Sequence, residues 1–203
     1  MSAPPVFDAG FAGQFAELLR WRRDVRRFRR DPVPAGLVEA LLAQMQLSPS
    51  VGHSQPWRWL AVEAPEQRRA VQDSFRRCHA DALASYAGER AALYARLKLE
   101  GLREAPVQFA VFCDQATERG HGLGRRTMPE MLDYSVVAAI TQFWLAARVH
   151  GLGVGWVSIL DPGAVAAALG PPPDWKLIAY LCIGWPEEDN DVPELVRAGW
   201  ERD

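Results

Sequence analysis

The chain has few cysteines and none of the spacings that a disulfide framework or a thiolate metal site requires. Its 203 residues include three cysteines, Cys78, Cys113 and Cys182, which lie far apart and form no CxxC pair. An odd number of widely spaced cysteines argues against disulfides and favours a reducing compartment. The four histidines also lack the spacings of a zinc site, so no metal is expected.

The chain also lacks a membrane-length apolar run, a signal peptide and a strong net charge. Asp133, Gln142 and Arg148 interrupt its most apolar stretch, which falls short of the roughly 20 residues that cross a bilayer. The first residues, MSAPPVFDAG, do not have the charged-then-apolar pattern of a secretory signal. The formal net charge is −2 and the isoelectric point is near 6.1, so bulk charge indicates neither nucleic acid nor membrane as a partner. We therefore expect a cytoplasmic protein.

The most apolar stretch, Asp133 to Leu160, predicts a buried helix that leads into a buried strand. DYSVVAAITQFWLAARVH is apolar on nearly every side, which is typical of a helix that is packed all round. GLGVG ends the helix, and GWVSIL has the composition of a short strand in which Ser158 is the polar residue. The glycines follow a helix instead of a strand, so they do not fit a dinucleotide-binding fingerprint. Ser158 also lacks the G-x-S-x-G context of a hydrolase nucleophile.

The remaining elements alternate between helices and strands. Helices are expected over 11–21, from Pro34, over 65–102 with a break near Gly88, and over 162–169. Strands are expected at WRWLAVE, APVQFAVFCD and WKLIAYLCIGW. In the first helix, Phe11, Phe15, Leu18 and Leu19 are spaced to share one face. This order predicts one α+β or α/β layered domain over residues 1–203, with a central mixed sheet.

An arginine-rich segment follows the first predicted helix. Seven arginines lie between Arg20 and Arg30, whereas residues 187–194 are acidic. Alternate residues of an extended chain share one side, so Arg22, Asp24 and Arg26 could face one ligand together. Guanidinium groups bind phosphate in a fixed fork, which suits a phosphorylated ligand. The alternatives are a solvated basic run or a nucleic-acid-binding arm.

The loop PSVGHSQPW, residues 49–57, is a second candidate site. It combines small residues, an amide and two prolines immediately before a predicted strand. Backbone N–H groups in such a loop could bind a heterocycle or a phosphate. The alternative is a tight, well-capped turn with no ligand.

Taken in order, these motifs make the chain resemble the flavin-dependent nitroreductase family. The motifs are RRDVRRF, PSVGHSQPW and the apolar helix that runs into GLGVGWVSIL, and the resemblance covers nearly the whole chain. KLEGLREAPVQFAVFCD, RRTMPEMLDYSVVAAI and PELVRAGWE resemble the branch of the family that makes 5,6-dimethylbenzimidazole, the lower ligand of cobalamin. The resemblance implies an α+β, three-layer nitroreductase-like fold around a buried apolar helix. It also implies an intertwined homodimer with two FMN sites at the subunit interface.

The resemblance implies a set of FMN-binding residues drawn from several segments. Residues 22–26 would grip FMN, residues 50 and 55 would come from the partner subunit, and residue 99 would lie near the polar edge of the flavin. Residues 158 and 159 would face the reactive side of the ring, and residue 197 would bind the phosphate. The full set is Arg22, Arg23, Asp24, Val25, Arg26, Ser50, Gln55, Leu99, Ser158, Ile159 and Arg197.

Two positions depart from ordinary nitroreductases, which usually carry serine or a similar small residue in place of Asp24 and asparagine in place of His53. An acid at position 24 suits proton movement better than hydride relay. The resemblance therefore implies Asp24 as the proton-transfer residue and Ser158 as a hydrogen-bonding residue near the reacting ring.

The implied activity is fragmentation of reduced FMN by oxygen to 5,6-dimethylbenzimidazole and erythrose 4-phosphate. A separate flavin reductase would supply the reduced FMN, and NAD(P)H would act only through that reductase. The alternative on the same fold is a conventional NAD(P)H-dependent nitroreductase or flavin reductase. A nucleic-acid-binding module that uses the arginine segment is a third interpretation, against which the apolar remainder and the acidic tail argue.

Overall fold

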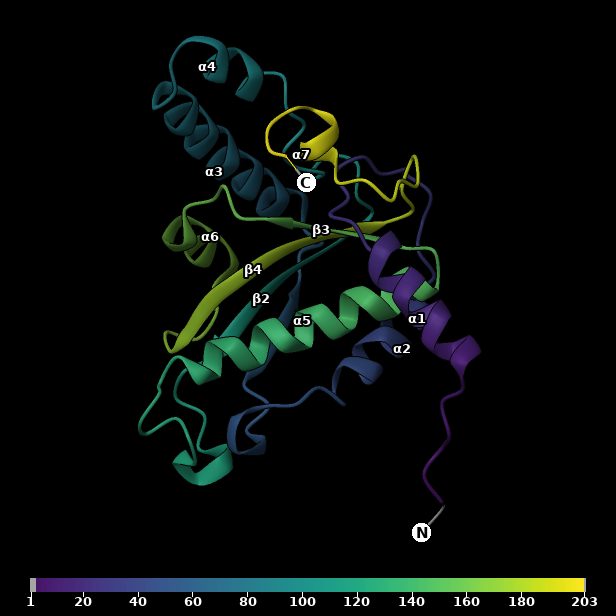
Figure 1. Cartoon of the computed structure of the whole chain (residues 1–203). Helices are drawn as coiled ribbons and strands as arrows, with labels where there is room; N and C mark the ends of the chain where they lie inside the picture. Colours follow the sequence, from purple (N-terminus) through teal and green to yellow (C-terminus); the bar gives the residue numbers. More distant parts are fainter. Residues whose placement is uncertain (1–2, 203) are drawn as a thin grey trace.

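A computed structural model describes residues 3–202, in which helices pack on both faces of one sheet (Figure 1). The helices are α1 (Ala9–Trp21), α2 (Ala35–Met45), α3 (Pro65–Ala84), α4 (Gly88–Tyr94), α5 (Met131–Val149), α6 (Pro162–Leu169) and α7 (Glu194–Arg197), with short 3-10 turns η1 (Val51–His53) and η2 (Arg119–Gly122). The strands are β1 (Trp57–Ala61), β2 (Val107–Asp114), β3 (Gly153–Val157) and β4 (Trp175–Gly184). The predicted α+β layered architecture is confirmed.

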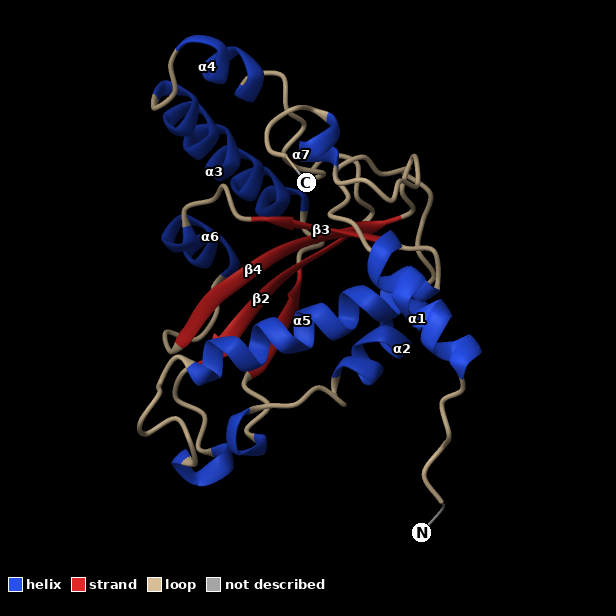
Figure 2. Ribbon diagram, viewed as in Figure 1, coloured by secondary structure: helices blue, strands red, loops and turns tan. Residues whose placement is uncertain are grey.

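The sheet has the strand order β1-β2-β4-β3, and each of its three strand pairings is antiparallel (Figure 2). The expectation of mixed strand directions is therefore wrong for these four strands. The order of helices and strands along the chain did not determine strand direction. When the helix between two strands leads back to the end of the sheet where the first strand finished, the second strand runs antiparallel to the first. A parallel pairing joins β3 to the arginine-rich segment, as an isolated bridge between Asp24 and Val154.

Both faces of the sheet are buried, and alternate residues of β2 supply the two cores. Phe109 and Val111 belong to the cluster beneath α2 and α5, whereas Ala110 and Phe112 belong to the cluster beneath α3 and α6. Successive side chains of a strand point to opposite faces, so a strand covered on both sides is apolar throughout. This explains the unbroken apolar run of β2, and it gives the three layers that the resemblance implied.

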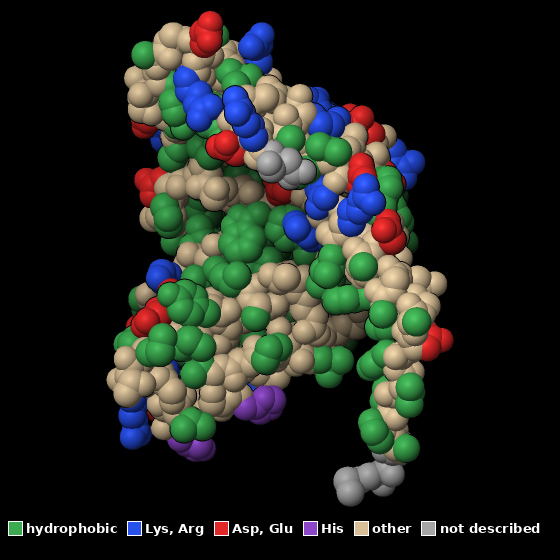
Figure 3. All heavy atoms as spheres, in the orientation of Figure 1, with side chains coloured by type: hydrophobic (Ala, Val, Ile, Leu, Met, Phe, Trp, Pro, Cys, Tyr) green, Lys and Arg blue, Asp and Glu red, His purple; other side chains and the backbone are tan. Residues whose placement is uncertain are grey.

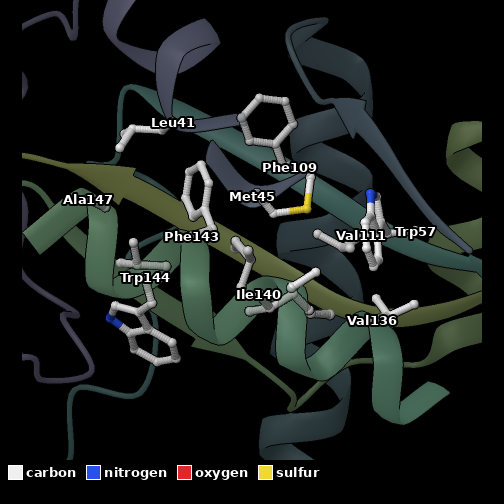
Figure 4. Packing of buried hydrophobic residues seen from close by; sticks show 14 of the residues in the cluster. Leu41, Met45, Trp57, Phe109, Val111, Val136, Ile140, Phe143, Trp144 and Ala147 are labelled. Atoms are coloured by element: carbon white, nitrogen blue, oxygen red, sulfur yellow. The ribbon is translucent and has the colours of Figure 1, made fainter. Parts of the chain in front are cut away.

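Helix α5 lies across the sheet and is the central element of the larger cluster (Figure 4). Val136, Ile140 and Phe143 are fully buried against the sheet and α2. The prediction that α5 is packed on all sides is wrong for the single chain, because Tyr134 is 55% exposed and Val137 is 38% exposed. The apolar residues on this side are therefore only partly covered by the described residues of the chain. No helix in the described part of the chain, α5 included, is both long and apolar enough to cross a membrane.

Helix α1 also leaves its apolar face uncovered. Phe11, Phe15 and Leu19 are all more than 40% exposed, and the Phe7, Phe11 and Phe15 rings lie one against the next. The predicted helix is confirmed, but its apolar face does not pack into the core of this chain. Such a continuous apolar row at the surface is typical of a protein–protein contact.

Candidate functional site

The arginine-rich segment lies along the free edge of β3. The Val25 N–H donates to the Val154 carbonyl oxygen at 3.0 Å, which makes the segment a short extension of the sheet. A Cβ at Gly155 would collide with the Val25 carbonyl oxygen, and one at Gly153 would lie 2.7 Å from a Val25 methyl group. The glycines of GLGVG are therefore required for the close approach of these two backbones.

Asp24 is held by both of its carboxylate oxygens. Oδ1 accepts a hydrogen bond from the Trp156 N–H at 2.9 Å, and Oδ2 accepts one from Arg26 Nε at 2.9 Å. An edge strand presents unpaired N–H groups, and the Asp24 side chain satisfies the one at Trp156. The carboxylate is consequently fixed beside β3, on the same strand edge that continues to Ser158.

Burial raises the pKa of the Asp24 carboxyl above its ordinary value. Arg26, the Trp156 N–H and Arg22 each oppose this rise, but desolvation outweighs them. A carboxyl with a raised pKa exchanges its proton nearer to neutral pH, which is the property that a general acid or base requires.

The raised pKa predicts a pH-dependent stability difference between the parent protein and Asp24→Asn. The folded state binds the Asp24 proton more tightly than the unfolded state, so ionising Asp24 destabilises the fold as pH rises through the folded pKa. Asparagine resembles the neutral acid, and we expect Asp24→Asn to be the more stable protein at pH 7. The advantage should shrink as pH falls towards the ordinary aspartate value. Urea unfolding of both proteins between pH 4 and pH 8 measures it, and a constant difference would contradict the raised pKa.

A small pocket opens between the arginine segment, α5 and the acidic tail segment, defined as residues 187–194. Its cavity volume is about 40 Å³, enough for a few water molecules. Its cationic lining residues are Arg22, Arg23, Arg26, Arg27, Arg148 and Arg197. The predicted site residues Arg22 to Arg26 and Arg197 are thus brought together from opposite ends of the chain.

Arg22 is the arginine in this pocket whose charge is least compensated. Its guanidinium carbon lies 5.0 Å from the centre of the Trp144 ring, and no salt bridge to Arg22 is found within residues 3–202. Desolvation and the neighbouring Arg23 charge lower its pKa, and Asp24 offsets them only in part. A partly buried cation beside another cation is a favourable site for an anion.

The acidic tail segment pairs with most of the other arginines. Asp191 accepts from Arg20 at 2.6 Å through its carboxylate and from Arg23 Nε at 2.9 Å through its carbonyl oxygen. Arg197 pairs with Glu188 at 2.9 Å, and Arg148 pairs with Asp189. The tail therefore lies over the cationic pocket and neutralises its rim.

The other predicted residues lie in three places. Ser158 follows the end of β3, is exposed, and is not inside the strand as predicted, because β3 ends at Val157. Ile159 is next to it, and Leu99 follows α4 in the segment whose Lys98 carbonyl accepts from Arg26. Asp24 and Ser158 thus share one strand edge, although no contact joins them.

Ser50 and Gln55 flank η1, well away from the arginine segment (Figure 1). Ser50 Oγ accepts from the Gln55 N–H at 3.0 Å, and the Gln55 amide bonds to Gln46 and Arg119. Within one chain these two residues do not join the pocket. In this chain the loop forms a tight turn closed by the Ser50–Gln55 hydrogen bond, and both interpretations of the loop stay predictions.

The sequence did not indicate three contributors to this site. They are the Trp144 ring under Arg22, the Trp156 N–H on Asp24, and the acidic tail segment over the pocket. The acidic tail was visible as a charge run, but its pairing with the arginines depends on the fold.

Figure 3 shows a hollow lined with hydrophobic side chains beside this cationic region, between α5 and the helices α3, α4 and α7. Within residues 3–202, no group of three or more histidine, cysteine or acidic side chains could hold a metal ion.

The chain is similar to known proteins along most of its length. A sequence model described as the nitroreductase family matches residues 19–185. The 5,6-dimethylbenzimidazole synthase of Rhodospirillum rubrum is 57% identical over 99% of this chain and 95% of its own, and that of Rhodobacter capsulatus is 48% identical over 96% and 94%. The structure of oxidized iodotyrosine deiodinase bound to FMN and 3-iodo-L-tyrosine matches with a TM-score of 0.72, at 23% identity over 86% of this chain and 91% of that one. The fold is thus nitroreductase-like, and the chain belongs to the nitroreductase family.

Proposed function

We propose that this protein is a 5,6-dimethylbenzimidazole synthase, an oxidoreductase of oxygenase type. Its reaction would be the oxygen-dependent fragmentation of reduced FMN to 5,6-dimethylbenzimidazole and erythrose 4-phosphate, for cobalamin biosynthesis. The observation that carries the proposal is the 57% identity with the R. rubrum synthase over 99% of the chain. The partly buried acid at position 24, bonded to the edge of β3, supports a reaction in which protons must be moved.

The residues present fit FMN as the bound substrate. Arg22 is the least compensated arginine of the pocket and, with Arg23 and Arg197 beside it, suits the phosphate. The cavity of about 40 Å³ is far too small for the flavin ring, which is better matched to the adjoining apolar hollow (Figure 3). Val25 and Leu99 would be further contacts of the flavin. Reduced FMN supplies both the electrons and the carbon skeleton, and oxygen is the oxidant.

The chemistry assigned to the chain itself is positioning and proton handling. Asp24 would hold or move a proton at its carboxylate, where a raised pKa brings proton exchange closer to neutral pH. Ser158 would hydrogen-bond to the substrate through its hydroxyl, with the neighbouring Ile159 excluding water. Enclosure matters here, because water-filled surroundings favour simple oxidation over fragmentation.

One experiment tests the whole proposal. The purified protein is mixed anaerobically with chemically reduced FMN and then exposed to oxygen, and the products are analysed by mass spectrometry. We expect 5,6-dimethylbenzimidazole to form without NAD(P)H. Oxidation of NADH by the protein with a nitroaromatic acceptor, and no benzimidazole, would instead identify a conventional nitroreductase.

We also propose that the functional form is a homodimer with shared FMN sites. The uncovered apolar face of α1 and the exposed side of α5 would pack against a second copy. Ser50 and Gln55 lie away from the pocket of their own chain, so they would reach the flavin only in the partner subunit.

A separate flavin reductase would supply reduced FMN. Free Cys78, Cys113 and Cys182 suit a cytoplasmic location.

Breaking the proposed interface should weaken FMN binding. Phe11→Glu combined with Phe15→Glu places two charges on the exposed face of α1 without disturbing the core of the chain. We expect the parent to sediment as a dimer and the double variant as a monomer whose FMN affinity is at least about tenfold lower, because half of each site is lost. Ala167→Glu, at an exposed position of α6 on the opposite face of the sheet, is the control. A monomer with parental FMN affinity would contradict the shared site.

Ser158→Ala should divert the reaction partly. The substitution removes one hydrogen bond and no charge from an exposed position, so folding should be unaffected. A single neutral hydrogen bond is worth about 0.5–1.5 kcal/mol, so benzimidazole formation should slow by about two- to tenfold. Single-turnover assays with reduced FMN measure the product yield. A yield equal to that of the parent would remove Ser158 from the reaction.

A further inference from the structure

Arg26 differs from the other arginines of the pocket in what it contacts. Its Nε donates to Asp24 Oδ2 at 2.9 Å, and its guanidinium also donates to the Lys98 carbonyl oxygen at 3.3 Å. Its side chain is 12% exposed, compared with 49% for Arg27. Arg26 therefore bonds to two partners of its own chain, whereas no carboxylate within residues 3–202 forms a salt bridge with Arg22.

Among the residues that the structure describes, Arg26 is the one cation that bonds directly to Asp24. Arg22 acts on Asp24 only through its charge, and β3 contributes the uncharged Trp156 N–H. On β4, burial raises the pKa of the Cys182 thiol, which keeps it neutral across the working range. In the segment after α4, Lys98 is already paired with acidic residues, at 3.2 Å to Glu104 and 3.6 Å to Glu100.

We propose that Arg26 is a positioning residue for Asp24 and not a ligand of the FMN phosphate. It would hold the carboxylate against β3 and favour its ionised form, while its bond to Lys98 ties this arrangement to the segment that contains Leu99. The inference deepens the proposed function, and it rests on that function for the importance of Asp24. It also reassigns Arg26 within the set of residues that the family resemblance placed around FMN.

The first test needs neither FMN nor turnover. The protein is labelled with ¹³C at aspartate carboxyl carbons, and the Asp24 signal is identified by its loss in Asp24→Asn. The Arg26→Gln variant lacks the cation that opposes desolvation, so the Asp24 titration midpoint should move upward. Arg26→Lys keeps the charge and should restore the midpoint in part. An unchanged midpoint in Arg26→Gln would overturn the proposal.

The control for the titration is Arg29→Gln. Arg29 lies in the same segment and also pairs with an aspartate two residues away, Asp31 at 3.6 Å, but both side chains are more than half exposed. Its loss should leave the Asp24 midpoint where it is. Circular dichroism confirms that each variant is folded, and Arg26→Lys keeps the test decisive should Arg26→Gln fail to fold.

The second test separates positioning from phosphate binding. Dissociation constants of FMN and riboflavin are measured for the parent and Arg26→Gln. The ratio of the two constants should stay within about threefold, because a lost charge-assisted bond to phosphate would change it by about tenfold or more. A collapse of the FMN preference in Arg26→Gln would show that Arg26 binds phosphate and would overturn the assignment.

The activity readout distinguishes a failure of this inference from a failure of the proposed function. If the parent forms benzimidazole, the pH profile of its rate should shift upward in Arg26→Gln, parallel to the Asp24 midpoint. If the parent forms none, the proposed function fails, yet the titration and the affinity ratio still decide the role of Arg26. A pH profile that stays fixed while the midpoint moves would overturn the link between Arg26 and catalysis.

Discussion

Asp24→Asn is expected to lower the rate of 5,6-dimethylbenzimidazole formation by about 10²–10⁴-fold, the usual contribution of a positioned acid or base. Binding of reduced FMN should remain within a few-fold of the parent. Asparagine preserves the shape of the side chain and can still accept the Trp156 N–H bond, but it cannot exchange a proton near neutral pH. Oxygen should still be consumed, and the products should become oxidised FMN and hydrogen peroxide.

The measurement is a single-turnover reaction in which oxygen uptake, peroxide and benzimidazole are all quantified. Asp31→Asn is the matched control, because Asp31 lies in the same segment with a 61% exposed side chain. Formation of the benzimidazole at the parental rate by Asp24→Asn would remove Asp24 from the mechanism. Failure of that variant to bind FMN at all would reduce Asp24 to a structural role.

The fold could be predicted from the sequence wherever one local pattern decided the outcome. The break at Gly88 separates α3 from α4, and Asp161 caps α6 through hydrogen bonds from the Gly163 and Ala164 N–H groups. These features depend on backbone conformation and on neighbouring residues in the chain. Strand direction and the end of β3 depend on pairing between distant segments, and there the predictions were wrong.

The candidate site was predictable in composition and less so in geometry. Because alternate side chains of an extended segment point to the same side, the sequence correctly placed Asp24 and Arg26 together, and in the structure they form an ion pair. It could not show that this pairing occupies Arg26, or that Trp144 lies under Arg22. The assigned FMN contacts, Ser50 and Gln55 included, stay predictions, as does the single domain over residues 1–203. Whether they meet the flavin depends on a second chain and a ligand.

The second large effect is expected at Arg22, whose charge has the least compensation in the pocket. If it binds the FMN phosphate, Arg22→Gln removes a charge-assisted interaction worth about 1.5–3 kcal/mol and should weaken FMN binding by about 10- to 150-fold. Riboflavin has no phosphate, so its affinity should change little. The preference of the protein for FMN over riboflavin should therefore fall by nearly the whole factor.

Titration calorimetry with both flavins at two salt concentrations measures this preference and its origin. The acidic tail segment pairs with Arg148 and Arg197 of the same pocket, so added salt should weaken FMN binding less than a bare cationic site would predict. Arg29→Gln, which removes an exposed arginine outside the pocket, should keep the full FMN preference. Equal losses of FMN and riboflavin affinity in Arg22→Gln would show that Arg22 supports the ring or the fold, and the phosphate would then have to bind elsewhere. Retention of nucleic acid by the parent at moderate salt would instead favour the nucleic-acid interpretation of the arginine segment.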